Sequence, residues 1–327
     1  MTGTTLTYLG PEGTFTHQAA MTAADMLAPV IDGERPKLVA APDVPTIMKA
    51  VESGQSWGVI AWENNVEGYV VPNLDALIDS HDVAGFARVG VGISFDAFVR
   101  RGTTSIQGAR VSAHSHGLAQ CKRFIAEHQL VAEPASSNAA ACRDLQVGQV
   151  AFGPGICGPL YGLEVIATDV QDYRGAHTEF LILAPRETSM RMLGQARERG
   201  IVEYETIITF IPLSTGPGVL ADLLDVLRDA GLNMTSFISR PIKGYDGTYS
   251  FIVTLDAAPW QERFQAVLTE VAEHGDWIKT LAVYPRRERP NPPVDAWMLP
   301  QGGVHLDAKS LSEGWRGDEL VRKELMW

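Results

Sequence analysis

The sequence predicts an α/β protein in which a two-lobed domain is followed by a smaller βαββαβ domain. In the first half, short apolar segments alternate with helical segments, a pattern typical of βαβ units and a mainly parallel sheet. Residues 90–99 and 178–183 read as strands that enter and leave a second lobe. After residue 203 the pattern of strands and helices restarts, which indicates a separate domain.

The elements of the first half follow from this alternation. We expect strands at 7–9 and 58–61, helices at 16–26 and 74–79, and a second lobe over residues 90–165. Ligands of open α/β sheets bind at the carboxyl ends of the strands. The sequence therefore predicts a site in a cleft between the two lobes.

The second half has the element order of a ferredoxin-like unit. The expected strands are 206–210, 234–240, 248–255 and 277–284, and the expected helices are 219–230 and 261–274. The predicted organisation is a two-lobed domain over 1–185, a charged linker over 186–203, a ferredoxin-like domain over 204–287, and a tail over 288–327 whose role the sequence does not indicate.

Composition and charge exclude several classes of protein. The 327 residues carry a net charge of −12 without a basic stripe, which argues against nucleic acid as a partner. No apolar run is long enough to span a bilayer, and the N-terminal residues lack the features of a signal peptide, so we expect a cytoplasmic protein. Cys121, Cys142 and Cys157 lack metal-ligand spacing and are interpreted as reduced structural residues. No cofactor or metal is expected, since His114 and His116 lack a third ligand.

Three short runs hold the candidate chemistry. Residues 8–15 read as a strand, a Gly/Pro/Thr turn and the start of a helix, an arrangement that offers backbone N–H groups to an anion. The second run is Glu63-Asn64-Asn65-Val66-Glu67-Gly68, and the third is His177-Thr178-Glu179-Phe180.

Together these runs resemble the prephenate dehydratase family, whose members carry Gly-Pro-Glu-Gly-Thr-Phe, Glu-Asn-Ser-x-x-Gly-x-Val and Thr-Arg-Phe runs. The resemblance spans residues 6–287 and continues through His114, Leu118 to Cys121, Ser136 to Ala141 and Tyr161 to Leu163. It implies a bilobal catalytic domain similar to periplasmic binding proteins and a C-terminal domain similar to ACT regulatory domains. It also implies prephenate as the small-molecule substrate, and a homodimer or homotetramer.

The resemblance further implies the site residues. Thr178, Glu179 and Phe180 form the catalytic run, and the substrate-binding positions are Gly13, Thr14, Glu63, Asn64, Asn65, Gly68, His114 and Asn138. In the ACT-like domain, the positions that match the family's phenylalanine-binding runs are Gly216, Gly218, Val219, Leu220, Ile238 and Arg240. Ile238 stands where the family has a glutamate, so we expect phenylalanine binding to be weak or lost. Alternatively, the domain remains as a dimerisation module.

Glu179 is the main departure from the family, because it replaces the arginine of the Thr-Arg-Phe run. A guanidinium binds a carboxylate, whereas a desolvated glutamate beside the dianionic substrate would repel it. The alternative is that Glu179 points to solvent, because neighbouring side chains alternate between the faces of a strand. His177 is a candidate proton donor, with the alternative that it faces away from Thr178.

A dehydratase must protonate the ring hydroxyl of prephenate, so that it leaves as water while carbon dioxide is lost. Glu179, Asn65 and Asn138 depart from the family and predict instead a non-aromatising prephenate decarboxylase. That carbon–carbon lyase would keep the hydroxyl and give dihydro-4-hydroxyphenylpyruvate for antibiotic or other natural-product biosynthesis. Thr178 is retained and counts against this reading. The alternatives are a prephenate dehydratase that makes phenylpyruvate for phenylalanine biosynthesis, and a non-catalytic protein that binds an anion or senses an amino acid.

Overall fold

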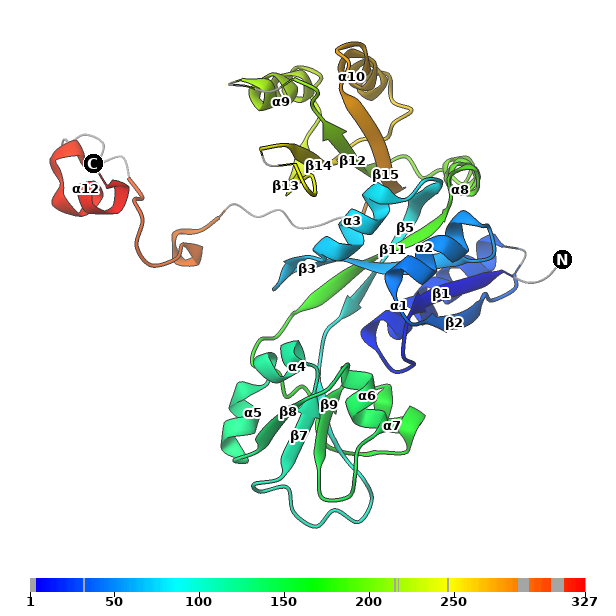
Figure 1. The fold of residues 1–327 in the computed structure, drawn as a ribbon, viewed down its shortest axis with the longest axis vertical. Coiled ribbons are helices and arrows are strands. Elements are labelled where there is room, and N and C mark those ends of the chain that lie inside the picture. The colour runs from blue at the N-terminus through cyan, green and yellow to red at the C-terminus, as the bar shows by residue number, and fades with distance from the viewer. Residues whose placement is uncertain are drawn as a thin grey trace. The chain divides into compact units, whose positions relative to one another are not determined.

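The structure is a computed structural model that describes residues 4–31, 33–214, 216, 218–245, 247–287, 294–306 and 315–326. The chain divides into two units, residues 1–286 and residues 287–327. The first unit contains one sheet of ten strands and one sheet of five strands (Figure 1).

The first lobe is built on six strands of the ten-stranded sheet. Its strands are β1 (Thr5–Leu9), β2 (Lys37–Ala41), β3 (Trp57–Asn64), β4 (Gly68–Tyr69), β5 (Val83–Gly92) and β11 (His177–Pro185), and its helices are α1 (Phe15–Leu27), η1 (Ala28–Val30), α2 (Val44–Glu52) and α3 (Val71–Asp79). β1 is parallel to β2 and β3, whereas β11 runs antiparallel between β3 and β5. The strand order β5-β11-β3-β1-β2 therefore brings the run around Thr178 beside the run around Asn64.

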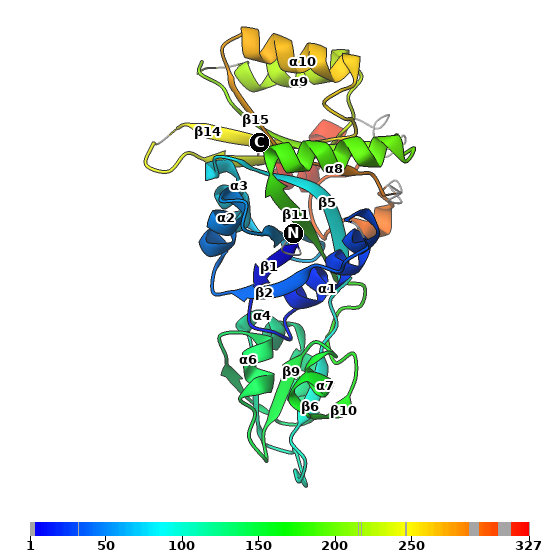
Figure 2. The same cartoon turned by 90° about the vertical axis from the view of Figure 1, so that its right-hand side faces the viewer.

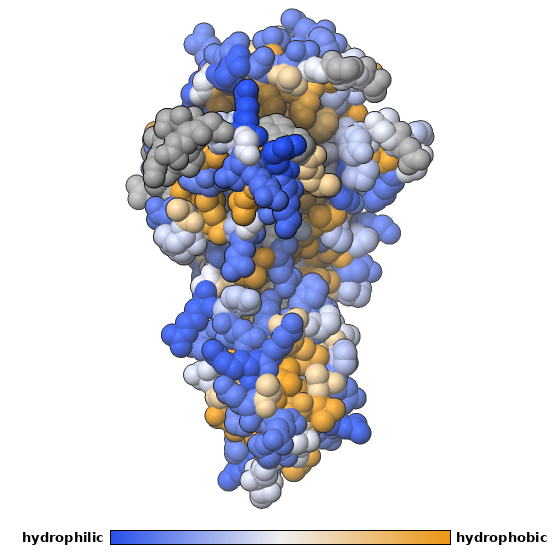
Figure 3. All heavy atoms as spheres, turned by 90° about the vertical axis from the view of Figure 1, so that its left-hand side faces the viewer, coloured by the Kyte–Doolittle hydropathy of each residue, from blue (hydrophilic) through white to orange (hydrophobic). Residues whose placement is uncertain are grey.

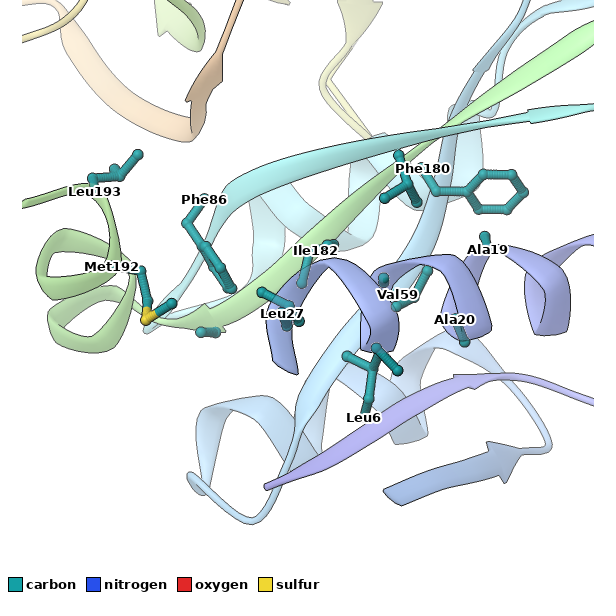
Figure 4. Packing of buried hydrophobic residues seen from close by; sticks show 14 of the residues in the cluster. Leu6, Ala19, Ala20, Leu27, Val59, Phe86, Phe180, Ile182, Met192 and Leu193 are labelled. Carbon is teal, nitrogen blue, oxygen red and sulfur yellow. The ribbon is translucent and has the colours of Figure 1, made fainter. Parts of the chain in front are cut away.

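Helix α1 packs a face of small side chains against this sheet. The hydroxyl of Thr14 caps the helix by accepting a hydrogen bond from the backbone N–H of His17. Ala19 and Ala20 are fully buried, and Figure 4 shows them beside Phe180 and other side chains of the sheet. The small alanine side chains let the helix lie close to the strands, so the turn before α1 is held firmly at the carboxyl end of β1.

The second lobe contains the five-stranded sheet. Its strands are β6 (Asp96–Val99), β7 (Arg110–Ala113), β8 (Val131–Pro134), β9 (Val150–Gly153) and β10 (Glu164–Ala167), in the order β10-β6-β9-β7-β8, and its helices are α4 (Ser115–Gln120), α5 (Lys122–Glu127), α6 (Asn138–Arg143) and α7 (Cys157–Tyr161). The prediction of one crossing strand over 90–99 is wrong, because β5 ends at Gly92 and β6 begins at Asp96 in the other sheet. Between them, the N–H of Ile93 donates to the carbonyl of Ala176, which ties the two crossing segments together.

The C-terminal part of the first unit has the predicted βαββαβ order. Its elements are β12 (Tyr204–Ile211), α9 (Val219–Asp229), β13 (Met234–Pro241), β14 (Tyr249–Leu255), α10 (Glu262–Glu273) and β15 (Trp277–Pro285). Both helices lie on one face of the strands (Figure 2). The strand β15 also pairs with β5 at Ala282 and Gly85, so the ferredoxin-like strands continue the sheet of the first lobe. The predicted fold class, a bilobal α/β domain followed by a ferredoxin-like domain, is confirmed.

The predicted linker forms the helix α8 (Arg186–Glu198). Its side chains Ser189, Met192 and Leu193 are buried, and Figure 4 shows Met192 and Leu193 near Phe86 of β5. The hydroxyl of Ser189 donates to the carbonyl of Ala84 at 3.0 Å. These contacts make α8 a packed element of the first unit.

The second unit contains η2 (Ala296–Met298), η3 (Trp315–Gly317) and α12 (Glu319–Leu325). The start of the predicted tail, residues 288–293, lies outside the described residues. Among the described residues, the helices are too short or too polar to cross a membrane. Figure 3 shows a face on which hydrophilic residues are interspersed with hydrophobic areas.

Candidate active site

The turn between β1 and α1 is held by hydrogen bonds within it. Gly13 has a φ of 86°, a conformation that favours glycine, and its N–H donates to Nδ1 of His17 at 3.0 Å. The ring of His17 stacks on Tyr8 at a centroid distance of 4.9 Å. Burial lowers the pKa of His17, although Glu12 acts in the opposite direction. Through these contacts His17 supports the turn that carries Gly13 and Thr14.

Asn64 and Thr178 form the centre of the candidate site. The Nδ2 of Asn64 donates to Oγ1 of Thr178 at 2.9 Å, while the Oδ1 of Asn64 accepts from the N–H groups of Val66 and Glu67, each at 2.9 Å. These bonds fix the orientation of the amide. Since the Thr178 oxygen accepts from Asn64, the hydroxyl proton of Thr178 remains available to a further acceptor.

Asn65 ties the loop after β3 to the start of β11. Its Nδ2 donates to the carbonyl of Gly175 at 2.9 Å, and its Oδ1 accepts from the N–H of His177 at 2.8 Å. The predicted substrate-binding residues Glu63 and Gly68 lie next to this loop and pair across β3 and β4 with Tyr69 and Asn64. The structure brings the second and third sequence runs together, and their contacts with a substrate remain predictions.

The second lobe contributes His114 and Asn138. The N–H of His114 donates to Oδ1 of Asn138 at 2.8 Å, and a Cβ added at Gly117 would lie 2.6 Å from the same oxygen. Gly117 is therefore needed for Asn138 to reach this position. Burial, followed by the neighbouring His116, lowers the pKa of His114. Both residues lie at the first turns of short helices, α4 and α6.

Two sets of contacts connect the lobes. On one side, Glu67 accepts from Gln120 at 2.9 Å and lies 2.9 Å from Nδ1 of His116. On the other side, the thiol of Cys157 donates to the carbonyl of Gly13 at 3.3 Å, and the hydroxyl of Tyr161 donates to the carbonyl of Glu12. The candidate residues of both lobes are thus held in one arrangement.

Glu179 lies in a buried charged cluster. Its Oε2 is 3.3 Å from Nε of Arg88, and Nη1 of Arg88 is 3.0 Å from Oε2 of Glu205. The guanidinium of Arg88 also lies over the ring of Tyr284, 4.8 Å from the centroid. The imidazole of His177 is 3.8 Å from Oε1 of Glu179, on the same side of β11. We call Arg88, Glu179, Glu205 and Tyr284 the Arg88 cluster.

The alternative reading, in which Glu179 points to solvent, is wrong, because its exposure is only 7%. Side chains alternate along β11, so Glu179 and Thr178 face opposite sides of the sheet. The carboxylate is compensated by Arg88, which weakens the expectation that it repels a substrate bound at Thr178. Phe180, on the same face as Thr178, is 2% exposed and belongs to the core around α1.

Sequence reasoning missed Arg88 and Glu205. Arg88 lies in the middle of the otherwise apolar strand β5, and Glu205 is the second residue of β12, whose residues are all buried except the last. Charged residues are almost never fully buried unless they are paired. That signal could have predicted a buried ion pair, although the sequence alone does not name its partners.

The positions predicted to bind phenylalanine do not all meet. Gly216, Val219 and Leu220 line a cavity of about 490 Å³ with Tyr249 and Phe251. Ile238 and Arg240 are not among the residues that line it. Ile238 packs on the core beside β3 and α3, and Arg240 forms a bidentate pair with Asp75 of α3 at 3.2 and 3.0 Å. Gly218 has a φ of 99° and precedes α9.

The fold and the candidate site place the protein in a class of two-lobed α/β enzymes that carry a ferredoxin-like domain after the two lobes. The prephenate dehydratase family model matches residues 6–188. A prephenate dehydratase of Mycolicibacterium vanbaalenii is 31% identical over 259 residues, which is 76% of this chain and 80% of the relative. The chain belongs to the prephenate dehydratase family.

Two solved structures resemble most of the chain. The crystal structure of prephenate dehydratase in complex with L-Phe from Arthrobacter aurescens has a TM-score of 0.71 and 27% identity, and it covers 88% of this chain and 93% of that one. A protein described as a novel type of quorum quenching acylase, GqqA, has a TM-score of 0.71 at 20% identity, with 86% of this chain and 98% of that one covered. At that identity the likeness concerns the fold alone.

Proposed function

We propose that the protein acts on prephenate as a dehydratase, releasing carbon dioxide and water to give phenylpyruvate. The hydrogen bond from Asn64 to Thr178 carries this proposal. It directs the hydroxyl proton of Thr178 away from Asn64, so Thr178 is placed to protonate the leaving hydroxyl of the substrate. Hydroxide is a poor leaving group, and a positioned proton donor is what the dehydration step requires.

The location of Glu179 is compatible with the same reaction. Its carboxylate lies with Arg88 on the face of β11 opposite to Thr178. The acid at this position therefore adds little negative charge on the side where the two substrate carboxylates would bind. The relatives named prephenate dehydratase are consistent with this function.

A second candidate function is the non-aromatising decarboxylation of prephenate. One observation favours it: position 179 holds glutamate where the family has arginine. The cation of the Arg88 cluster is therefore Arg88 of β5, and β11 contributes an acid to the cluster. In this case the ring hydroxyl would be kept, and the product would be a dihydro-4-hydroxyphenylpyruvate.

Purified protein incubated with prephenate should give phenylpyruvate as its main product, identified by mass spectrometry and NMR. Glu179→Gln, which removes the charge but keeps the shape, should leave this product unchanged. Glu179→Arg is a poorer test, since it would place a second guanidinium beside Arg88. A non-aromatic keto acid as the main product would contradict the dehydratase proposal and support the decarboxylase. Absence of any turnover would favour a protein that only binds its ligand.

We also propose that phenylalanine binds weakly to this protein. Ile238 offers no carboxylate to the amino group, and Arg240 is engaged by Asp75. Calorimetry should give no saturable heat at micromolar phenylalanine, and activity should not change at that concentration. Asp75→Asn, which releases Arg240 from its pair, should not by itself create micromolar binding. A micromolar affinity of the unaltered protein, accompanied by a change in activity, would refute this proposal.

A further inference from the structure

A second cavity, separate from the one around Gly216, lies between α8 and the ferredoxin-like domain. Its volume is about 440 Å³, within the range of small-molecule sites. We call it the α8 cavity. Its lining residues come from the start of β5, from α8, from the loop before α10, from α10 and from β15: Ala84, Gly85, Arg186, Ser189, Met190, Leu193, Gly194, Arg197, Pro259, Trp260, Gln265, Thr280 and Val283.

Two arginines give the α8 cavity a positive charge. The guanidinium of Arg186 is half-buried and donates from Nη2 to the carbonyl of Thr280 at 2.8 Å. The guanidinium of Arg197 lies over the ring of Trp260, 4.7 Å from its centroid. In the described part of the chain, neither arginine lies within ion-pair distance of a carboxylate. Burial lowers the pKa of Arg186, and Asp82 acts in the opposite direction.

The remaining wall of the α8 cavity is mostly apolar. Met190, Leu193, Pro259, Trp260 and Val283 provide an aliphatic and aromatic surface. None of the lining residues is acidic, and Asp82, which raises the pKa of Arg186, is not among them. An ammonium group inside the cavity would therefore meet two cations without a carboxylate to pair with it.

Gly194 borders open space in the wall of the α8 cavity. A Cβ added at this position would have no neighbouring heavy atom within 4 Å, although glycine in the middle of a helix costs about 1 kcal/mol relative to alanine. Gly194 is thus a residue of low helix propensity in α8, at a position where a larger side chain would not clash with its neighbours. The open space beside Gly194 is part of the volume that a ligand could fill.

We propose that the α8 cavity binds a monocarboxylate with an aromatic body and no α-ammonium group. The carboxylate would lie between Arg186 and Arg197, and the ring would contact Trp260 and the apolar wall. Aryl-substituted 2-oxo acids and arylalkanoic acids have this chemistry, whereas free amino acids do not. This site is distinct from the cavity around Gly216 and from the Thr178 site, and it does not depend on the reaction that the protein catalyses.

The test uses 3-phenylpropionate as the probe and phenylalanine as its counterpart, since the two differ at the α-carbon by the ammonium group. In calorimetry with the full chain, 3-phenylpropionate should bind with at least about tenfold higher affinity than phenylalanine. Arg197→Gln should weaken its binding about tenfold or more, the scale of one charge-assisted contact. Gly194→Leu should abolish the binding by filling the cavity.

The controls are Arg191→Gln, which removes an exposed arginine of α8 outside the cavity, and Gly194→Ala, which adds only a methyl group. Both should keep the affinity of the wild-type protein. The proposal is overturned if wild-type protein does not bind 3-phenylpropionate, if phenylalanine binds equally well, or if binding survives Gly194→Leu.

Discussion

Arg88→Met should lower the free energy of unfolding by about 3–5 kcal/mol, the cost of removing one partner from a buried ion pair. Arg88 is 5% exposed and compensates both Glu179 and Glu205. Without it, two carboxylates would remain close together in a site shielded from water. Urea unfolding followed by circular dichroism measures the loss.

The exposed Arg191→Met is the matched control and should change the stability by less than about 0.5 kcal/mol. The triple variant Arg88→Met/Glu179→Gln/Glu205→Gln should recover much of the stability, because it removes the uncompensated charges together with the cation. If Arg88→Met alone unfolds at the same urea concentration as wild type, the Arg88 cluster does not hold the carboxylates as described.

Thr178→Val should lower the turnover of prephenate by well over tenfold while the protein stays folded, because the variant keeps the branched shape but loses the hydroxyl. Asn64→Ala should have an effect of the same order, since it releases the hydrogen bond that orients Thr178. Both are measured as kcat and KM for consumption of prephenate.

Thr178→Ser, which retains a hydroxyl, is the control and should keep most of the activity. The loss in Thr178→Val should fall mainly on kcat if the hydroxyl acts in the transition state. A Thr178→Val variant with wild-type kcat would exclude Thr178 as the proton donor.

Local sequence patterns predicted several strands and helices with small errors at their ends, but they did not name β2, α2 or most elements of the second lobe. The helix predicted over 219–230 is α9, Val219–Asp229, and the strand predicted over 178–183 is β11, His177–Pro185. These segments are governed by hydrophobic periodicity and turn residues, which are local properties. The prediction of one strand over 90–99 was wrong because the chain leaves the first sheet after Gly92. There Ile93 donates a hydrogen bond to Ala176 of the segment that returns from the second lobe, a contact that no local pattern reveals.

The sequence could predict the candidate-site residues that belong to the three family runs. It could not predict the side chains from distant strands that pair with those residues. Asn64 and Thr178, which belong to two of these runs, are joined by a hydrogen bond, and their contacts with a substrate remain predictions. The environment of Glu179 depends on Arg88 and Glu205, which belong to β5 and β12 and have no spacing relation to Glu179. Similarly, Arg240 is bound by Asp75, an acid of α3 that no run in the sequence marks.

The pairing of β15 with β5 has a consequence for where the chain can be cut. A Cβ at Gly85 would lie 2.7 Å from Cβ of Ala282, so glycine is needed for the two strands to approach. Removal of the ferredoxin-like domain would turn β5 into an exposed sheet edge, and such edges promote aggregation. It would also take Glu205 and Tyr284 away from Arg88. The ferredoxin-like domain thus protects the sheet that carries Thr178, which makes a chain truncated before this domain an unsuitable form for expression or assay.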